Sequence, residues 1–162
     1  MLDSGKRRAA QARLWMGKGF AALGIGVALL GVTAGTARAE PAIPDDTLVL
    51  RLRQADPAHG ERAFRKCRLC HKLDRGVSGS LGPTLYGVVG ASVAGDSGYR
   101  RYSEALRTLG GLWTLERLDA YLKSPKSAVP GTSMAFVGIA DPAERAALIN
   151  WMNAHSDNPV EY

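Results

Sequence analysis

Cysteine is scarce in this chain of 162 residues, and its scarcity excludes several classes of protein. Two cysteines are too few for a small disulfide-rich scaffold or for a structural zinc site of four cysteines. Sequence signals for β-strands are nearly absent, and no internal repeat or low-complexity segment occurs. Hydrophobic residues make up 46% of the chain and charged residues 22%, which excludes a disordered protein. The length allows a single folded domain, and the missing strand signals favour helices.

The first 39 residues have the three parts of an export signal peptide. Five basic residues occur before position 19, an uncharged run follows over 19–37, and Ala37-Arg38-Ala39 has the small-x-small pattern of a cleavage site. We therefore expect 1–39 to be a cleavable signal that directs the mature chain to the periplasm. The alternative is an uncleaved membrane anchor, because the uncharged run is nearly long enough to span a bilayer. Its richness in Gly, Ala and Thr weakens that alternative.

Removal of the signal would change the electrostatic character of the protein. The whole chain has a formal net charge of +6, but six of its 21 basic residues and one of its 15 acidic residues lie in 1–39. Residues 40–162 therefore carry fifteen basic and fourteen acidic side chains, a net charge of +1. A nucleic-acid partner is not expected from so balanced a chain. Export to an oxidising compartment also requires an explanation for two cysteines three positions apart.

Helix-capping signals divide the mature chain into short helices and long loops. They predict helices over 56–67, 103–106, 114–124 and from 141 onward, with Asp56, Ser103, Thr114 and Asp141 as N-caps. A long Gly- and Ser-rich stretch separates the first two helices, and such loops in a small domain are usually functional. The expected fold class is all-α, with four to five short helices. Residues 40–55 form a leader without an assigned role, and 56–162 form the domain.

The chemistry of the chain is concentrated in the sequence Cys67-Arg68-Leu69-Cys70-His71. This C-x-x-C-H pattern in an exported protein is the attachment signature of c-type haem. Two thiols one helical turn apart can bond to two vinyl groups of one porphyrin, and the adjacent histidine can reach the iron as an axial ligand. A zinc site would need two more ligands, and only His59 and His155 remain. A thioredoxin-like redox pair would need a βαβ setting, and a plain disulfide leaves the histidine unexplained.

A second axial ligand has few candidates in the mature chain. Met152 falls on the apolar stripe of the last predicted helix, which favours a role in core packing. Met134 follows Pro-Gly-Thr-Ser in a turn, where a thioether suits the sixth coordination position of a haem iron. His59 and His155 are the competing candidates, and we expect both at the surface.

The sequence is similar to the class I c-type cytochromes, particularly the bacterial cytochrome c2-like and mitochondrial-like type. The similarity covers 56–154, most of the mature chain. It rests on five segments in order: Asp56-Pro57…Gly60-Glu61…Phe64, Cys67-x-x-Cys70-His71, Gly82-Pro83-Thr84-Leu85-Tyr86-Gly87, Tyr121-Leu122-Lys123-Ser124-Pro125-Lys126 and Val129-Pro130-Gly131-Thr132-Ser133-Met134.

The resemblance implies a cytochrome c fold with long loops wrapped around one haem c, bound covalently through Cys67 and Cys70. It also implies that His71 and Met134 are the iron ligands. Pro83 matches the residue whose carbonyl accepts a hydrogen bond from the second ring nitrogen of the ligand histidine.

Other cofactor-binding roles also follow from the resemblance alone. Tyr102 and Trp113 match donors to a buried haem propionate, Tyr121 a hydroxyl near the methionine sulfur, and Thr132 a residue of the methionine loop. The chain departs from the family at Ala91 and Ser92, where a buried arginine often stands beside the propionates. Arg100 or Arg101 is the possible substitute.

The resemblance implies a soluble periplasmic electron carrier rather than an enzyme, since a His/Met haem has no open position for a substrate. Single electrons would pass by outer-sphere transfer between respiratory or photosynthetic redox partners. One alternative is a dedicated electron-accepting subunit of a periplasmic dehydrogenase complex, with 40–55 as its contact. Another is a haem sensor or peroxidase with a labile methionine ligand.

The charge distribution indicates partners with acidic docking surfaces. Six basic residues and one acidic residue lie between 62 and 75, and Lys123 and Lys126 precede the methionine loop. By contrast, 141–162 contains four acidic residues and one basic residue. A membrane cytochrome complex, an oxidase, a reaction centre or a dehydrogenase would fit. We expect a monomer, with only transient membrane contact unless the signal is retained as an anchor.

Overall fold

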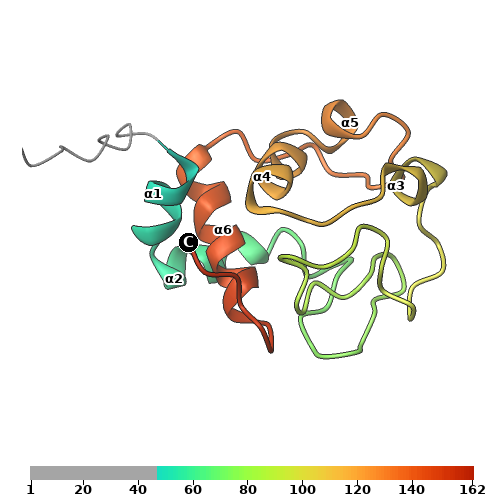
Figure 1. Ribbon diagram of the computed structural model, residues 1–162, viewed down its shortest axis with the longest axis horizontal. Coiled ribbons are helices and arrows are strands. Elements are labelled where there is room, and N and C mark those ends of the chain that lie inside the picture. Colours follow the sequence, from blue (N-terminus) through green and yellow to red (C-terminus); the bar gives the residue numbers. More distant parts are fainter. Residues whose placement is uncertain (1–46) are drawn as a thin grey trace, which may run out of the picture. The chain divides into compact units, whose positions relative to one another are not determined.

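The computed structural model describes residues 47–162, so the expected signal peptide at 1–39 lies outside the described residues. Within this range the chain forms six helices and a single isolated bridge between Ser92 and Leu112. The helices are α1 (Leu48–Arg53), α2 (Pro57–Phe64), α3 (Glu104–Leu109), α4 (Leu115–Lys123), α5 (Pro125–Ala128) and α6 (Pro142–Ala154) (Figure 1). The all-α prediction is confirmed. No helix within 47–162 has the length and apolar character needed to cross a bilayer.

The N-caps predicted at Asp56, Ser103, Thr114 and Asp141 are all confirmed. Each side chain accepts a hydrogen bond from a backbone N–H two or three residues later, which satisfies a donor that the helix itself leaves free.

Two short helices were not predicted from the sequence. Helix α1 lies in the unassigned leader, where Thr47 accepts from the N–H of Leu50. Helix α5 begins at Pro125, the residue expected only to end α4. A proline that cannot continue one helix is well suited to begin another, because its fixed φ matches the first helical position. Helices of six and four residues are too short to show a hydrophobic period.

Helices α2 and α6 pack closely on one another, and α1 and α4 also lie against α6 (Figure 1). The close approach depends on Gly60. A Cβ atom at that position would lie 2.3 Å from the carbonyl oxygen of Ala147 and 2.6 Å from Cβ of Trp151. Because real Cβ atoms do not approach backbone so closely, any larger residue at Gly60 would push the two helices apart.

Helix α1 is held by its packing and by the C-terminal segment. Leu52 is fully buried against the core. Arg53 Nε donates to the Tyr162 carbonyl oxygen at 3.0 Å, and the Tyr162 hydroxyl donates to Asn150 Oδ1 at 2.7 Å. The part of the leader that the structure describes is thus integrated into the domain, since its apolar face is already covered.

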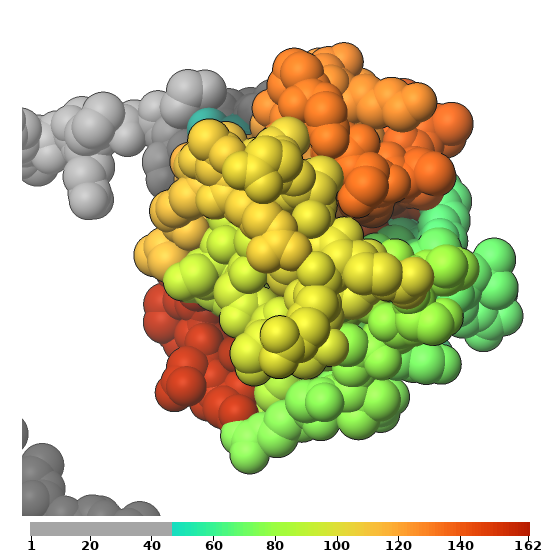
Figure 2. All heavy atoms as spheres, turned by 90° about the vertical axis from the view of Figure 1, so that its right-hand side faces the viewer, coloured from blue at the N-terminus to red at the C-terminus, as the bar shows by residue number. Residues whose placement is uncertain are grey.

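Long loops complete the side of the domain away from α1 and α2. The segments around 80–110 cover the face seen in Figure 2, in green to yellow, and the segment that follows α4, in orange, borders them. The core continues between these loops and the helices. It includes Val89, Val93, Leu106, Trp113, Leu118, Tyr121, Leu122, Val129, Ile139, Leu148, Ile149 and Met152.

Candidate functional site

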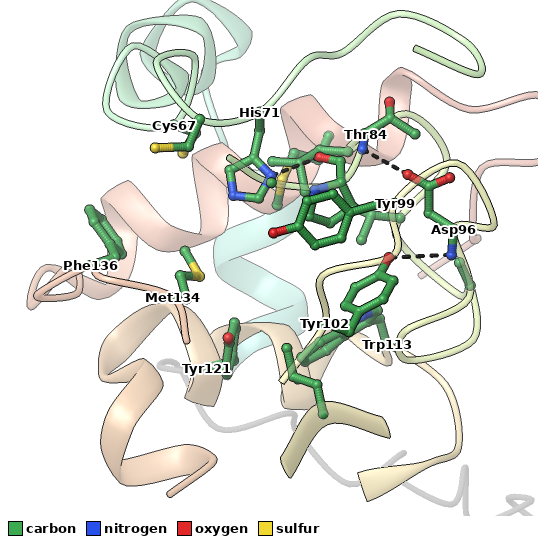
Figure 3. Close-up of a pocket in the computed structure, with 18 of the residues that line it drawn as sticks. Cys67, His71, Thr84, Asp96, Tyr99, Tyr102, Trp113, Tyr121, Met134 and Phe136 are labelled. Atoms are coloured by element: carbon green, nitrogen blue, oxygen red, sulfur yellow. Dashed lines mark hydrogen bonds between the residues drawn. The ribbon is translucent and has the colours of Figure 1, made fainter. Parts of the chain in front are cut away.

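A cavity of about 610 Å³ lies between the helices and the long loops. Its wall is formed mainly by apolar and aromatic side chains, from the cysteine segment, the loops over 81–102, helix α4 and the segment 133–136. Of the nine cofactor-binding residues that the resemblance implies, all except Thr132 line it. Figure 3 shows His71 and Met134 pointing into the cavity from different segments.

The C-x-x-C-H residues follow α2 as a run of hydrogen-bonded turns. The Cys67 N–H donates to the Phe64 carbonyl at 2.8 Å, and the His71 N–H donates to the Cys67 carbonyl at 2.9 Å. This winding places both thiols and the imidazole beside the same cavity. Both cysteines are free, Cys67 buried and Cys70 exposed. Burial raises the pKa of the Cys67 thiol to about 11, so it is protonated at neutral pH.

The imidazole of His71 is fixed in orientation and in tautomer. Its Nδ1 lies 2.8 Å from the Pro83 carbonyl oxygen, which can only accept, so Nδ1 carries the proton and Nε2 has a free lone pair. Gly82 permits this approach, because a Cβ there would lie 2.5 Å from His71 Cε1. Burial lowers the pKa of His71, with a smaller opposing effect of the hydrogen bond to Pro83. A neutral imidazole with an unprotonated nitrogen is the form that a metal requires.

The methionine segment is anchored to α4. The hydroxyls of Tyr121 and Thr132 are hydrogen-bonded at 2.7 Å, and Thr132 Oγ1 accepts from the Met134 N–H at 3.3 Å. Gly131, with φ +89°, provides the left-handed turn that begins the segment. Thr132 therefore contributes to the site without lining the cavity, by connecting Met134 to a buried tyrosine of α4.

One end of the cavity has a wall of aromatic and polar side chains. The Tyr99 and Tyr102 rings meet edge to face at 5.0 Å, and the Trp113 and Tyr121 rings lie 4.9 Å apart. The Tyr102 hydroxyl accepts from the N–H of Asp96 at 3.3 Å (Figure 3). Burial raises the pKa values of Tyr102 and Tyr121, so both remain protonated donors near neutral pH.

Asp96 and Tyr99 are wall residues that the sequence analysis did not identify. The Asp96 carboxylate accepts from the Ser78 hydroxyl, from the Thr84 N–H at 3.1 Å and from the Gly98 N–H at 2.9 Å. It therefore connects two loops that are distant in sequence. The available signal was weak: an aspartate two residues before a glycine is a common turn element.

Neither arginine suggested as a substitute for the missing buried cation lines the cavity. Arg100 and Arg101 are both exposed, and the Arg101 guanidinium lies 5.8 Å from the centre of the Tyr99 ring. Among the described residues, Lys66 is the only lysine or arginine in the wall. The aromatic end of the cavity thus offers hydroxyl and indole donors in place of a guanidinium.

The competing ligand candidates are not in the cavity wall. His155 Nδ1 lies 2.7 Å from the Trp151 carbonyl oxygen, and the centres of the His155 and Trp151 rings lie 4.4 Å apart with the rings tilted by 52°. The sequence analysis expected His59 and His155 at the surface, but both are half-buried. Met152 is 2% exposed, which confirms its core position, although it also touches the cavity from α6.

The residues present fit a haem. The cavity is large and apolar, two free thiols and a neutral imidazole lie together in its wall, and a thioether enters from another segment. The aromatic end could accept hydrogen-bonding carboxylates. No group of three or more His, Cys, Asp or Glu side chains that could bind a metal ion occurs within the described residues.

Asp96→Asn tests the loop connection. Burial raises the pKa of Asp96, but the hydrogen bonds from Ser78, Gly98 and Thr84 outweigh it and lower the pKa overall. The stabilisation is therefore present above the unfolded pKa of about 4 and is lost as pH falls through the lower folded-state pKa. We expect Asp96→Asn to reduce the free energy of unfolding in denaturant at neutral pH, by an amount that shrinks at about pH 3.

The exposed Asp74→Asn serves as the matched control and should change little at either pH. A difference between wild type and Asp96→Asn that is the same at both pH values would contradict this assignment.

Comparisons with known proteins agree with the fit. No family model matches the chain. It is 46% identical over 99 residues to a cytochrome c-type cyt cy of Rhodobacter capsulatus, covering 60% of this chain and 48% of that protein. The chain thus spans about half the length of that relative.

Shorter relatives are matched over nearly their whole length. A cytochrome c2 of Agrobacterium tumefaciens is 38% identical over 102 residues, which cover 61% of this chain and 91% of that protein. The solved structure of cytochrome cH from Methylobacterium extorquens superimposes with a TM-score of 0.56 at 40% identity, covering 62% of this chain and 99% of that one. The chain therefore belongs to the class I c-type cytochromes, which carry covalently bound haem c.

Proposed function

We propose that this cytochrome is a soluble, monomeric electron carrier of the periplasm, with haem c attached through Cys67 and Cys70. The observation that carries the proposal is the pairing of His71 and Met134, which enter one apolar cavity from different segments. His71 Nε2 and Met134 Sδ would hold the iron of the haem. The haem, when bound, supplies a one-electron ferric/ferrous couple whose potential is raised by methionine ligation.

The chain's own residues have three tasks in this proposal. Pro83 holds the imidazole in one tautomer, and Tyr121 and Thr132 hold the segment that presents the thioether. The apolar wall excludes water, which lowers the reorganisation that accompanies a change of charge. Tyr102 and Trp113 would donate hydrogen bonds to the propionates at the aromatic end.

Electron transfer without substrate chemistry is part of this proposal. His71 and Met134 would both hold the iron, which would leave no coordination site for a substrate. The sensor or peroxidase alternative would need Met134 to leave the iron, and its segment is anchored to α4. The alternative in which the leader contacts a dehydrogenase receives little support from α1, whose Leu52 is buried within the domain.

The basic segment 62–75, which contains both cysteines, supports docking to acidic redox partners. Three of its six basic side chains form ion pairs: Arg62 with Asp56, Lys66 with Glu144 and Arg75 with Asp157. Within the described residues the other three, Arg65, Arg68 and Lys72, form no ion pair and are exposed. Unpaired cations around the cysteine segment would orient a partner toward the haem attachment side. A membrane cytochrome complex, an oxidase, a reaction centre or a dehydrogenase are the proposed partner classes.

Methionine ligation is tested by matched substitutions that preserve side-chain volume. Protein matured with haem should show the weak red charge-transfer band of methionine-ligated ferric haem. We expect Met134→Leu to abolish the band and Met152→Leu to retain it, because Met134 enters the cavity from a loop, whereas Met152 is packed in the core on α6. Loss of the band in Met152→Leu with retention in Met134→Leu would reverse the assignment.

Charge-steered docking predicts that the rate of electron transfer to an acidic protein partner falls as ionic strength rises, since salt screens attraction over roughly 10 Å at 0.1 M. Stopped-flow measurement over a range of salt concentrations would show it. Reduction by a small neutral reductant is the control and should be nearly independent of salt. A flat profile with the protein partner would refute steering by the basic segment.

A further inference from the structure

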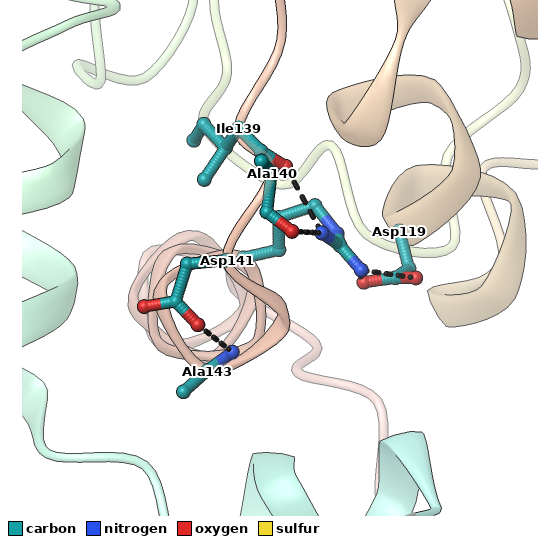
Figure 4. A network of polar contacts seen from close by, with 6 residues as sticks. Asp119, Ile139, Ala140, Asp141 and Ala143 are labelled. Carbon is teal, nitrogen blue, oxygen red and sulfur yellow. Dashed lines mark hydrogen bonds and ion pairs between the residues drawn. The ribbon is translucent and has the colours of Figure 1, made fainter.

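Arg145 is an almost fully buried cation on α6, with 5% of its surface exposed. Its Nε donates to Asp119 Oδ1 at 2.8 Å, and Nη2 lies 3.3 Å from Asp119 Oδ2. Its Nη1 donates to two backbone carbonyls, Ile139 at 2.9 Å and Ala140 at 2.8 Å. Figure 4 shows the Asp119 carboxylate and these two carbonyls arranged around the same guanidinium. A single side chain thus joins α4, α6 and the loop between them.

That loop is the continuation of the methionine segment. Ile139 donates its N–H to the Leu122 carbonyl at 2.8 Å. Gly138, at φ +102°, lies so close to α4 that a Cβ would be 2.2 Å from the Lys123 carbonyl oxygen. At the other end of the segment, Thr132 is bonded to Tyr121. Residues 132–140 are therefore fixed to α4 at both ends, and Arg145 supplies the charged contacts at the second end.

We propose that Arg145 and Asp119 act as positioning residues for Met134, and that they set how readily its thioether leaves the iron to admit an external ligand. The proposal rests on the proposed function, in which Met134 binds the iron. The pair touches neither the cavity nor Met134 and acts through the backbone of 139–140.

The physical reason is the strength of the anchor at the second end. Charge-assisted hydrogen bonds from a buried guanidinium are stronger than neutral ones, and their loss leaves two carbonyls without a partner away from water. Without Arg145 that end is held to α4 only by the Ile139–Leu122 hydrogen bond and the packing at Gly138, so the segment opens more often. The apparent affinity of a ligand that binds only the open form rises in proportion to the open fraction.

Imidazole is a suitable probe, because it competes with a thioether for ferric iron. We would titrate haem-loaded ferric protein with imidazole and follow the loss of the red band. Arg145→Met is expected to increase the apparent affinity for imidazole about tenfold or more, with smaller increases in Arg145→Lys and Asp119→Asn. The two milder variants keep the test available if Arg145→Met fails to fold.

Arg117→Met is the matched control. Arg117 is also a helix arginine, on α4, whose Nη1 donates to the Gly110 carbonyl at 2.8 Å and the Leu112 carbonyl at 3.2 Å. It therefore anchors a loop that does not carry Met134. We expect Arg117→Met to leave the imidazole affinity close to wild type, even where denaturant unfolding shows an equal loss of stability.

Two outcomes would overturn the proposal. One is unchanged imidazole affinity in the Arg145 and Asp119 variants. The other is an equal increase in Arg117→Met at equal loss of stability, which would show a general structural role. Failure of the proposed function would be visible separately, since the Met134→Leu variant would then still show the red band.

Discussion

The hydrogen bond between His71 Nδ1 and the Pro83 carbonyl oxygen, 2.8 Å long, is the contact on which the site depends. It determines which imidazole nitrogen carries a proton, and it holds the loop over 81–86 against the end of the cysteine segment. The contact needs a glycine at position 82, where no Cβ fits beside the ring. This bond fixes the orientation of the imidazole ring, and therefore the direction in which Nε2, the nitrogen proposed to bind the iron, points.

The Met134 side of the cavity is positioned by attachment of a loop to a helix. Met134 lies on a segment without regular structure, and its position comes from attachment to α4 at Thr132 and at Ile139. Helix α4 in turn packs on α6, which packs on α2, the helix that leads into Cys67. The histidine and methionine sides are therefore connected through three helices. Within that connection, α2 packs directly on α6 where Gly60 allows close approach.

Much of this could be predicted from the sequence where the signal is local. The N-caps at Asp56, Ser103, Thr114 and Asp141 depend on a side chain two or three residues from its partner, and all were found. The resemblance also identified four segments that contribute to the cavity wall: the cysteine segment, 82–87, 121–126 and 129–134. Tertiary contacts gave no such signal. Helix α1 is stable because Leu52 is buried against distant parts of the chain, and the leader's composition does not reveal this.

The sequence analysis also missed charged side chains whose partners are distant in the sequence. Asp96 lies outside the five segments that carry the resemblance, and its role as an acceptor for Ser78 and Thr84 exists only once two loops meet. The sequence analysis did not single out Arg145, which the fold buries between Asp119 and two carbonyls. Burial of a charge is decided by its partners, and those partners lie on other elements.

A crystal structure of the haem-loaded protein with anomalous data at the iron edge would show whether His71 and Met134 bind the same iron. We expect a single iron peak within coordination distance of both His71 Nε2 and Met134 Sδ, with His71 Nδ1 still bonded to the Pro83 carbonyl. An iron bound by His59 or His155, or a Met134 side chain turned away from the metal, would contradict this expectation.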